Sequence, residues 1–392
     1  MKIVETREFF ELFRGEKEFF PGRILSKKYL LEYVVLVPLR ASPNDSNLLK
    51  INDIGNMAIH VNNNSGMYKI KTLFSILLLK NFPFLQFSPT LFYHILKENP
   101  DLIIDIPYTT FTPRTYIAYV ASRILYIPIL FINSGDLPGK KGFLRRLLMP
   151  LESYIYKRSK IIALNAIAKD YLSKEYSLKE GAISVIPKGV DTKKWSPLNK
   201  DLHEMRSKYN LPSQNIILYV GRLDRRKGIA SLIEAAKQLN NFTIMLVGNG
   251  PDKDYFVDMC RDFDINNLIF LEFVENVKLP ELYAIADIVI IPDMTNPVGF
   301  STVLSEAMSM GKAIVIGIKD FEGAVPIEHM KTGIIIEPNS TKEIVIFVNY
   351  LHENPQVKRF IESNVREFAK SNMDYDIVMD RYYNIIMATI KN

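Results

Sequence analysis

Two cations stand five residues apart, just after an apolar segment near the middle of the chain. Residues 216–220 read Ile-Ile-Leu-Tyr-Val, a run typical of a strand buried on both faces. Arg222 and Lys227 follow around a short turn, and a helical pattern begins almost at once. A strand end, two cations and a helix N-terminus together predict an anion site, which a diphosphate fits best. The alternative is a turn with solvated surface charges, and this is what we expect of Arg225 and Arg226.

A second segment with chemical potential lies about seventy residues later. A loop rich in Pro, Asn and Gly precedes a predicted helix that starts at Ser301 or Thr302. Gly299 allows close backbone approach, so the free N–H groups at the helix start can meet a phosphate or a sugar hydroxyl. Glu306 lies one turn into the helix, where a carboxylate can accept two hydrogen bonds from a vicinal diol such as the 2′- and 3′-hydroxyls of ribose. The alternative is a solvent-facing helix glutamate.

Four motifs in a fixed order give these segments a family resemblance. They read VIPKGVDTKKWSP (Val185 to Pro197), YVGRLDRRKG (219–228), LVGNGP (Leu246 to Pro251) and PVGFSTVLSEAM (297–308). This series resembles the family 4 retaining glycosyltransferases, and the resemblance covers roughly residues 159–318. It implies an α/β chain of GT-B architecture, in which two Rossmann-like domains with parallel sheets face each other across a cleft.

The resemblance also implies that the two domains have different functions, one on the acceptor side and one in donor binding. Residues 1–188 would form the acceptor-side domain, with a C-terminal helix at about 374–392 packing back on it. Residues 189–373 would bind a nucleotide-diphosphate sugar, whose glycosyl group is transferred to an acceptor with retention. Arg222 and Lys227 would be catalytic, because they can neutralise charge that grows on the departing diphosphate. The implied donor-binding set is Gly221, Arg222, Lys227, Gly248, Gly250, Phe273, Val274, Gly299, Phe300, Ser301, Thr302 and Glu306.

Two positions depart from the family pattern. Val298 stands where the family has the first of two glutamates, and Ser134 stands at a frequent histidine position. Asp136 is then the titratable group nearest to the transferred sugar, although a loop or capping role is an equal alternative. Either the sugar is recognised differently, or the chain is a non-catalytic GT-B protein that binds a nucleotide sugar or serves as a partner subunit. A GT-B epimerase is a third, weaker alternative.

Charge is distributed unevenly along the 392 residues. Residues 1–190 carry 26 Lys and Arg against 16 Asp and Glu, whereas residues 191–392 carry 23 against 27. Within the first half, four cations alternate with leucines and a phenylalanine, and these cations are Lys140, Lys141, Arg145 and Arg146. This pattern predicts a basic amphipathic helix, broken or restarted at Pro150, on the acceptor side. An anionic membrane surface or a lipid-linked acceptor fits it, and the alternative is a packed helix with snorkelling cations.

Other features exclude several classes. We find no nucleic-acid-binding module, no apolar run of the length needed to span a bilayer and no secretion signal at the start, so we expect a cytoplasmic protein that can bind the membrane surface. Cys260 is the only cysteine and is expected to be a small, partly buried side chain. No paired-aspartate set suits a metal, and Asp262 and Asp264 lie in a polar connector. We expect no metal and no cofactor beyond the nucleotide-sugar co-substrate.

Apolar runs and breakers predict the elements that would position these residues. The first strand is predicted at 33–39, after a possible amphipathic helix containing Phe9 to Phe20 and a turn at Pro21-Gly22. A strand at 57–61 and one or two helices between 68 and 94 would follow. Further strands are predicted at 102–106, 128–132, 161–164 and 183–187, and a helix at Thr112-Pro113. The second domain is predicted as a parallel sheet with strands at 216–220, 243–247, 268–271, 288–291, 313–316 and 333–336.

Overall fold

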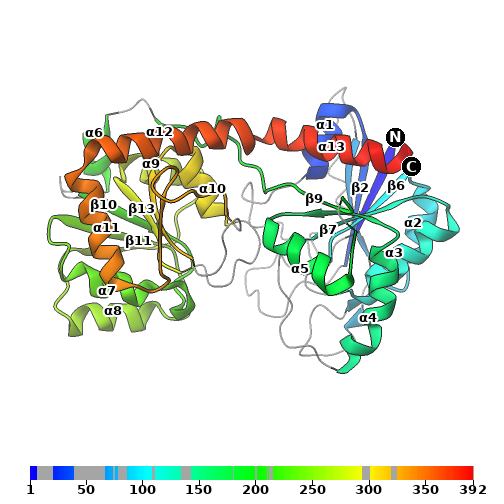
Figure 1. Ribbon diagram of the computed structural model, residues 1–392, viewed down its shortest axis with the longest axis horizontal. Helices are drawn as coiled ribbons and strands as arrows, with labels where there is room; N and C mark the ends of the chain where they lie inside the picture. The colour runs from blue at the N-terminus through cyan, green and yellow to red at the C-terminus, as the bar shows by residue number, and fades with distance from the viewer. Residues whose placement is uncertain are drawn as a thin grey trace. The chain divides into compact units, whose positions relative to one another are not determined.

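The structure is a computed structural model in which the chain forms two α/β units. It describes residues 1–6, 21–38, 67–73, 76–77, 86–107, 111–133, 143–179, 181–198, 201–209, 211, 215–293, 301–318 and 325–391. The first unit comprises Met1–Pro187 and Val378–Asn392, and the second comprises Lys188–Ile377. Each unit has its own sheet (Figure 1). Each unit also has its own hydrophobic core.

The first unit is built on a seven-stranded parallel sheet. Its strand order is β3-β2-β1-β6-β7-β8-β9. The strands are β1 (Lys2–Thr6), β2 (Glu32–Pro38), β3 (Met67–Leu73), β6 (Leu102–Asp105), β7 (Ile129–Asn133), β8 (Lys160–Ala163) and β9 (Ile183–Val185). The two-residue strands β4 (Ile76–Leu77) and β5 (Gln86–Phe87) pair separately.

Helices cover both faces of this sheet, because successive strand residues point to opposite sides. Val4 and Val34 face a core completed by α2 (Leu91–Glu98), α3 (Pro113–Ile124), α4 (Phe143–Tyr156) and α5 (Ala166–Tyr176). Ile3 and Val35 face the opposite core, which is completed by α1 (Pro21–Tyr29) and α13 (Tyr375–Lys391).

Several predictions for this unit are wrong, and β1 is the clearest. No strand was predicted before residue 33, yet β1 lies between β2 and β6 in the sheet. Its buried Glu5 accepts a hydrogen bond from the Tyr33 hydroxyl, and the Thr6 hydroxyl donates to Asp105. Polar side chains interrupt the apolar pattern from which a buried strand is predicted. Their hydrogen-bond partners lie on other strands and are present only in the folded sheet.

Three other elements differ from prediction. The segment 67–73 is the edge strand β3, consistent with the alternation of Lys69 and Lys71, and was predicted to be helical. Pro21 begins α1 instead of forming a turn, since proline is suited to a first helical turn. The helix α4 continues through Pro150, which lies at an exposed position. The predictions at residues 9–20 and 57–61 lie outside the described residues.

The second unit confirms all six predicted parallel strands to within one residue at either end. They are β10 (Asn215–Val220), β11 (Phe242–Val247), β12 (Leu268–Leu271), β13 (Ile288–Ile291), β14 (Ala313–Gly317) and β15 (Ile334–Ile336), in the order β12-β11-β10-β13-β14-β15. The strand order reverses direction at β10, which pairs with both β11 and β13. In such sheets ligands bind outside the carboxyl ends of the strands at this point.

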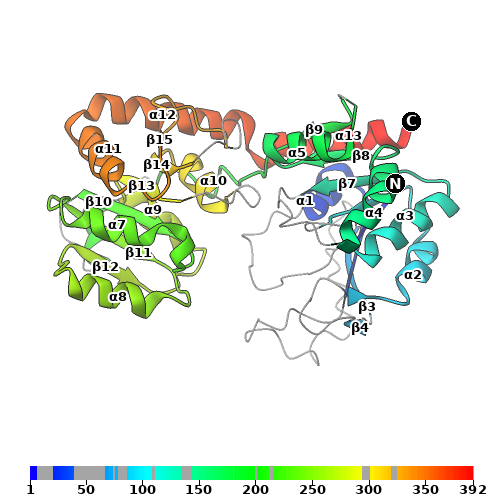
Figure 2. The ribbon, with the colours of Figure 1, turned by 60° about the horizontal axis from the view of Figure 1, so that its bottom comes forward.

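Two layers of helices enclose the second sheet. One core is completed by α7 (Ile229–Ala236), α8 (Lys253–Asp262) and α11 (Thr341–Glu353). The other is completed by α6 (Leu202–Lys208), α9 (Leu279–Ile285), α10 (Thr302–Ser309) and α12 (Pro355–Asn372). Figure 2 shows α8 and α12 on opposite sides of the sheet.

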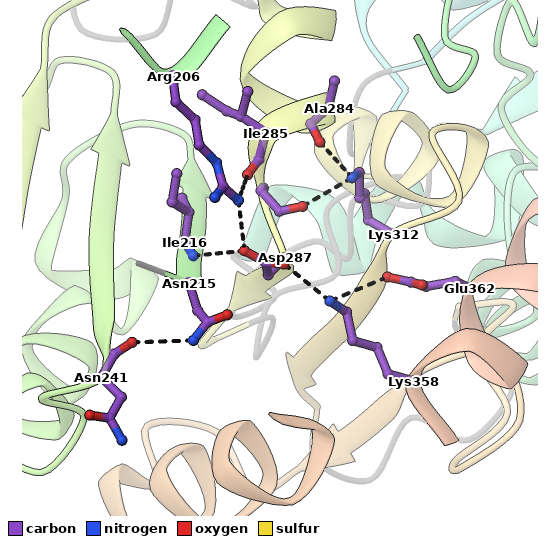
Figure 3. Close-up of polar contacts among 11 residues, drawn as sticks. Arg206, Asn215, Ile216, Asn241, Ala284, Ile285, Asp287, Lys312, Lys358 and Glu362 are labelled. Atoms are coloured by element: carbon purple, nitrogen blue, oxygen red, sulfur yellow. Dashed lines mark hydrogen bonds and ion pairs between the residues drawn. The ribbon is translucent and has the colours of Figure 1, made fainter. Parts of the chain in front are cut away.

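An ion-pair network ties the elements together at the amino edge of this sheet (Figure 3). Asp287 precedes β13, and its carboxylate accepts a hydrogen bond from the Ile216 N–H at 2.9 Å. The same carboxylate pairs with Arg206 of α6 at 3.2 Å and with Lys358 of α12 at 3.3 Å. Lys312, just before β14, donates to the carbonyls of Ala284 and Ala286 at the end of α9, at 2.9 and 3.0 Å.

Lys312 should make stability depend on pH in a defined direction. Burial lowers the pKa of its ammonium from 10.5 to about 8, against the opposing attraction of Glu362 and Asp287. The folded state therefore releases this proton at lower pH than the unfolded state does. Its unfavourable contribution is complete below pH 8 and disappears as pH rises towards 10.5, for a gain of about 1 to 3 kcal/mol.

The comparison of wild type with Lys312→Met isolates this effect from other titrations. Urea denaturation of both proteins between pH 7 and 10 should show wild type gaining stability relative to the variant above pH 8. Parallel stability curves over this range would contradict the assignment.

Candidate functional site

The turn after β10 is held by hydrogen bonds to the end of β11 and to the loop that follows it. The Gly221 N–H donates to the Val247 carbonyl at 3.0 Å, and the Leu223 N–H donates to the Asn249 carbonyl at 3.1 Å. The Tyr219 hydroxyl donates to the Arg222 carbonyl at 2.9 Å. The backbone that carries the predicted cations is therefore fixed from two sides.

A short 3₁₀ helix, Arg225–Lys227, connects this turn to α7. Asp224 caps it by accepting a hydrogen bond from the Arg226 N–H at 3.0 Å. Gly228 follows with φ +70°, a conformation that favours glycine, and α7 starts at the next residue. The predicted sequence of strand, tight turn and helix is confirmed.

Of the four cations in this turn, Arg225 and Arg226 are held in close ion pairs with aspartates. Arg226 pairs with Asp224 at 2.6 Å, and its hydrogen bonds hold the pKa of that carboxyl well below the ordinary range. Arg225 pairs with Asp252 at 3.2 Å and stacks on the Tyr255 ring.

The other two cations, Arg222 and Lys227, make no close ion pair with a described residue. We call them the loosely engaged cations. Arg222 is 65% exposed and lies 4.0 Å from Asp224, the limit of an ion pair. Lys227 is exposed, and its ammonium makes no ion pair with another described residue. These two side chains can therefore meet an anionic ligand without first breaking a close salt bridge.

Glycines bring the carboxyl ends of neighbouring strands into backbone contact. A Cβ on Gly248, after β11, would lie 2.0 Å from the Gly221 carbonyl oxygen, and one on Gly250 would lie 2.1 Å from that of Leu223. A Cβ on Gly228 would lie 2.8 Å from Pro292, which follows β13. These glycines are required for packing, and their predicted contact with a donor stays a prediction.

The predicted helix after β13 is confirmed as α10. It runs from Thr302 to Ser309, and the Ser301 side chain caps it by accepting from the Leu304 N–H at 3.3 Å. The Lys188 ammonium donates to the Thr302 hydroxyl at 3.2 Å, which places a cation at the helix start. Sequence reasoning missed Lys188, although its position within the motif VIPKGVD was a usable signal. The predicted donor residues Gly299 and Phe300 lie outside the described residues.

Glu306 is buried, so the alternative of a solvent-facing glutamate is wrong. Its side chain is 1% exposed, and its Oε2 accepts a hydrogen bond from the Tyr283 hydroxyl of α9 at 2.9 Å. Burial, together with the nearby Glu306 carboxylate, raises the pKa of Tyr283 well above its ordinary value. The Trp195 and Tyr283 rings pack perpendicular to each other, with centroids 5.6 Å apart. Sequence reasoning did not single out Tyr283, which lies in an ordinary apolar helical pattern.

Of the remaining predicted site residues, some are described by the structure and others lie outside the described residues. Phe273 is 73% exposed and Val274 is half-buried, just beyond the carboxyl end of β12. Arg146 is exposed on α4, and the side chain of Arg145 is not described. Asp136, Ser134, Lys140, Lys141 and Val298 lie outside the described residues. Among the described residues no group of three or more His, Cys, Asp or Glu could hold a metal ion.

Two family models match the chain, one in each half. The model of Glycosyltransferase Family 4 matches residues 60–194, and that of Glycosyl transferases group 1 matches residues 202–368. The chain belongs to the family 4 glycosyltransferases. The second match includes the turn after β10, the glycines after β11 and all of α10.

Known proteins similar to this glycosyltransferase chain support the assignment. An uncharacterized glycosyltransferase of Methanocaldococcus jannaschii is 25% identical over 59% of this chain and 60% of its own length. A GDP-mannose-dependent alpha-(1-6)-phosphatidylinositol monomannoside mannosyltransferase of Mycolicibacterium smegmatis is 27% identical over 50% of this chain and 53% of its own. The chain thus matches less than two thirds of the length of each.

Solved structures confirm the GT-B fold. HepE of Anabaena, crystallised with UDP, superposes with a TM-score of 0.75 at 18% identity and covers 99% of this chain and all of that one. At this identity the likeness concerns the fold alone.

Proposed function

We propose that the protein transfers a sugar from a nucleotide-diphosphate sugar to an acceptor, with retention and without a bound metal ion. The observation that carries the proposal is the pair Arg222 and Lys227, two loosely engaged cations at the carboxyl end of β10. The sheet reverses its order there, at the position where such sheets bind nucleotides. The GDP-mannose dependence of the mycobacterial relative and the UDP in the HepE crystal support a nucleoside diphosphate as the leaving group.

The proposed chemistry follows from where charge develops. When the glycosidic bond breaks, negative charge grows on the diphosphate, and preorganised cations stabilise that charge more than they stabilise the ground state. Arg222 can form two parallel hydrogen bonds to phosphate oxygens, and Lys227 supplies a compact charge. Lys188 and the N-terminus of α10 add positive potential on the side of the site formed by this helix. Asp136 stays our proposed side chain nearest to the transferred sugar.

Removal of either loosely engaged cation should weaken the binding of nucleoside diphosphates. We expect Arg222→Ala and Lys227→Ala each to cost about 1.5 to 3 kcal/mol, the range for a charge-assisted hydrogen bond. Isothermal titration with UDP and GDP measures the loss. Arg225→Ala is the matched control, because Arg225 is occupied by Asp252 and Tyr255 and should have a much smaller effect. Equal affinities for all four proteins would show that the site is misplaced.

Turnover separates the enzyme from the alternative of a non-catalytic nucleotide-sugar-binding protein. The specific reason for this alternative is Val298, which cannot accept a hydrogen bond or transfer a proton where the family has a glutamate. We expect slow release of nucleoside diphosphate from the preferred donor without acceptor, unchanged by EDTA. Tight binding with no release, even with membrane lipids supplied as acceptors, would support the non-catalytic protein.

We further propose an acceptor linked to lipid, approached from the cytoplasmic surface of a membrane. On α4, Leu147 is 65% exposed, and Leu151 and Tyr154 are close to half exposed. Glu152, the one acid in this helix, is buried and accepts a hydrogen bond from Tyr176 at 2.7 Å. The exposed surface of α4 therefore combines apolar side chains with the cation Arg146, which suits an anionic lipid surface.

Exposed apolar residues at the end of α3 and the name of a relative agree with this proposal. Ile124 of α3 and Tyr126 just after it are 53% and 93% exposed, and α3 contains no acid. The mycobacterial relative is named for a phosphatidylinositol glycolipid acceptor. No helix in the described ranges is long and apolar enough to cross a bilayer. The proposed association is therefore peripheral.

Vesicle binding tests the membrane proposal. Changing Lys140, Lys141, Arg145 and Arg146 together to Gln should reduce sedimentation with anionic vesicles, because each cation near such a surface contributes about 1 kcal/mol. Binding of wild type should also fall with salt. A control with Lys237, Lys278, Lys331 and Lys370 changed to Gln alters the net charge equally on the second unit. Equal recovery of wild type on anionic and neutral vesicles would contradict the proposal.

A further inference from the structure

The buried contact between Tyr283 and Glu306 has no role in the proposed transfer chemistry. We propose that Tyr283 is a positioning residue that holds the Glu306 carboxylate for the ribose hydroxyls and so makes the site selective for ribonucleotides. This inference rests on the proposed function, in which the second unit binds a nucleotide sugar.

Tyr283 is held from several directions. It is completely buried, and its hydroxyl donates to Glu306 Oε2 at 2.9 Å. Trp195, itself 5% exposed, packs perpendicular to the Tyr283 ring. The Trp195 carbonyl accepts hydrogen bonds from the Ser309 hydroxyl at 2.6 Å and from Arg366 at 3.0 Å. Ser309 lies on α10 three residues after Glu306, so the tyrosine and the glutamate belong to one rigid assembly.

The chemistry of the pair fixes the direction of the hydrogen bond. Burial and the adjacent carboxylate raise the pKa of the phenol, so it stays protonated through the neutral range and remains the donor. Glu306 Oε2 therefore accepts a hydrogen bond from a phenol that keeps its proton. A carboxylate held in one rotamer loses less conformational entropy on binding than a freely rotating one does.

The position of Glu306 on α10 determines where its fixed carboxylate would meet a ligand. The Cβ of a helical residue tilts towards the helix N-terminus, so the Glu306 side chain lies over the turn that begins at Thr302. That end of α10 also carries the Lys188 contact. A ribose bound there would meet an acceptor of fixed orientation. Its diol would hydrogen-bond well only when both hydroxyls are present, since a site built to pair with a hydroxyl discriminates strongly against its absence.

The test compares a ribonucleotide with its 2′-deoxy counterpart. Isothermal titration of wild type with UDP and 2′-deoxy-UDP, and with the two forms of GDP, should give a preference for the ribose form on the order of 10-fold. Tyr283→Phe removes one oxygen and should weaken ribonucleotide binding several-fold. Its affinity for the deoxy form should stay within about twofold of wild type, so the preference collapses.

A control and a second variant keep the result interpretable. Tyr382→Phe removes a hydroxyl from an equally buried tyrosine of the first unit and should retain the full preference. If Tyr283→Phe does not fold, Trp195→Phe loosens the tyrosine while keeping its hydroxyl, and it should reduce the preference by a smaller factor.

The outcomes separate this inference from the proposed function. A preference that survives Tyr283→Phe, or equal weakening of both ligands, overturns the positioning role while leaving nucleotide binding intact. A wild type that binds both forms equally overturns the ribose role of Glu306 and the inference with it. A wild type that binds no nucleoside diphosphate overturns the proposed function itself.

Discussion

The structure of the candidate site depends on one packing constraint, the close approach of backbones at the carboxyl ends of β10 and β11. The loop after β11 presses against the turn after β10 at distances that only glycine permits at positions 248 and 250. A side chain at either position would displace a carbonyl of the turn. Since the same turn carries Arg222, the position of that guanidinium depends on atoms that it never touches. Preorganisation of this kind is what an electrostatic site requires.

The two edges of the second sheet differ in how their cations are paired. At the amino edge, Asp287 is surrounded by Arg206, Lys358 and a backbone N–H, so opposite charges meet within the protein (Figure 3). At the carboxyl edge, Asp224 is satisfied by Arg226 and by the capped 3₁₀ helix, which leaves Arg222 at the limit of pairing. The first arrangement fastens helices to strands. The second leaves positive charge available to a ligand, and both use ordinary aspartates at strand or helix termini.

The sequence predicted the second unit well and the first unit less well, for a physical reason. Continuous apolar runs are typical of strands buried on both faces, and the six strands of the second unit consist almost entirely of apolar residues, although β12 is only partly buried. In the first unit β1 contains Glu5 and Thr6, whose burial depends on Tyr33 and Asp105 from other strands. No local pattern reveals such partners. The same limit applies to Glu306, whose place on α10 was predictable from its spacing, whereas its burial depends on a tyrosine 23 residues earlier in the chain.

In the proposed function, the two parts of the site differ in solvent exposure and therefore in their role. Arg222 and Lys227 lie in solvent, where their attraction for a diphosphate is screened by salt and is indifferent to the base and the sugar. Such cations contribute affinity and stabilise developing charge without choosing among nucleotides. The contact of Tyr283 with Glu306 is buried, so salt screens it little, and its geometry is fixed by packing. The proposed selectivity therefore depends on the buried pair, because discrimination requires a polar group that is costly to leave without a partner.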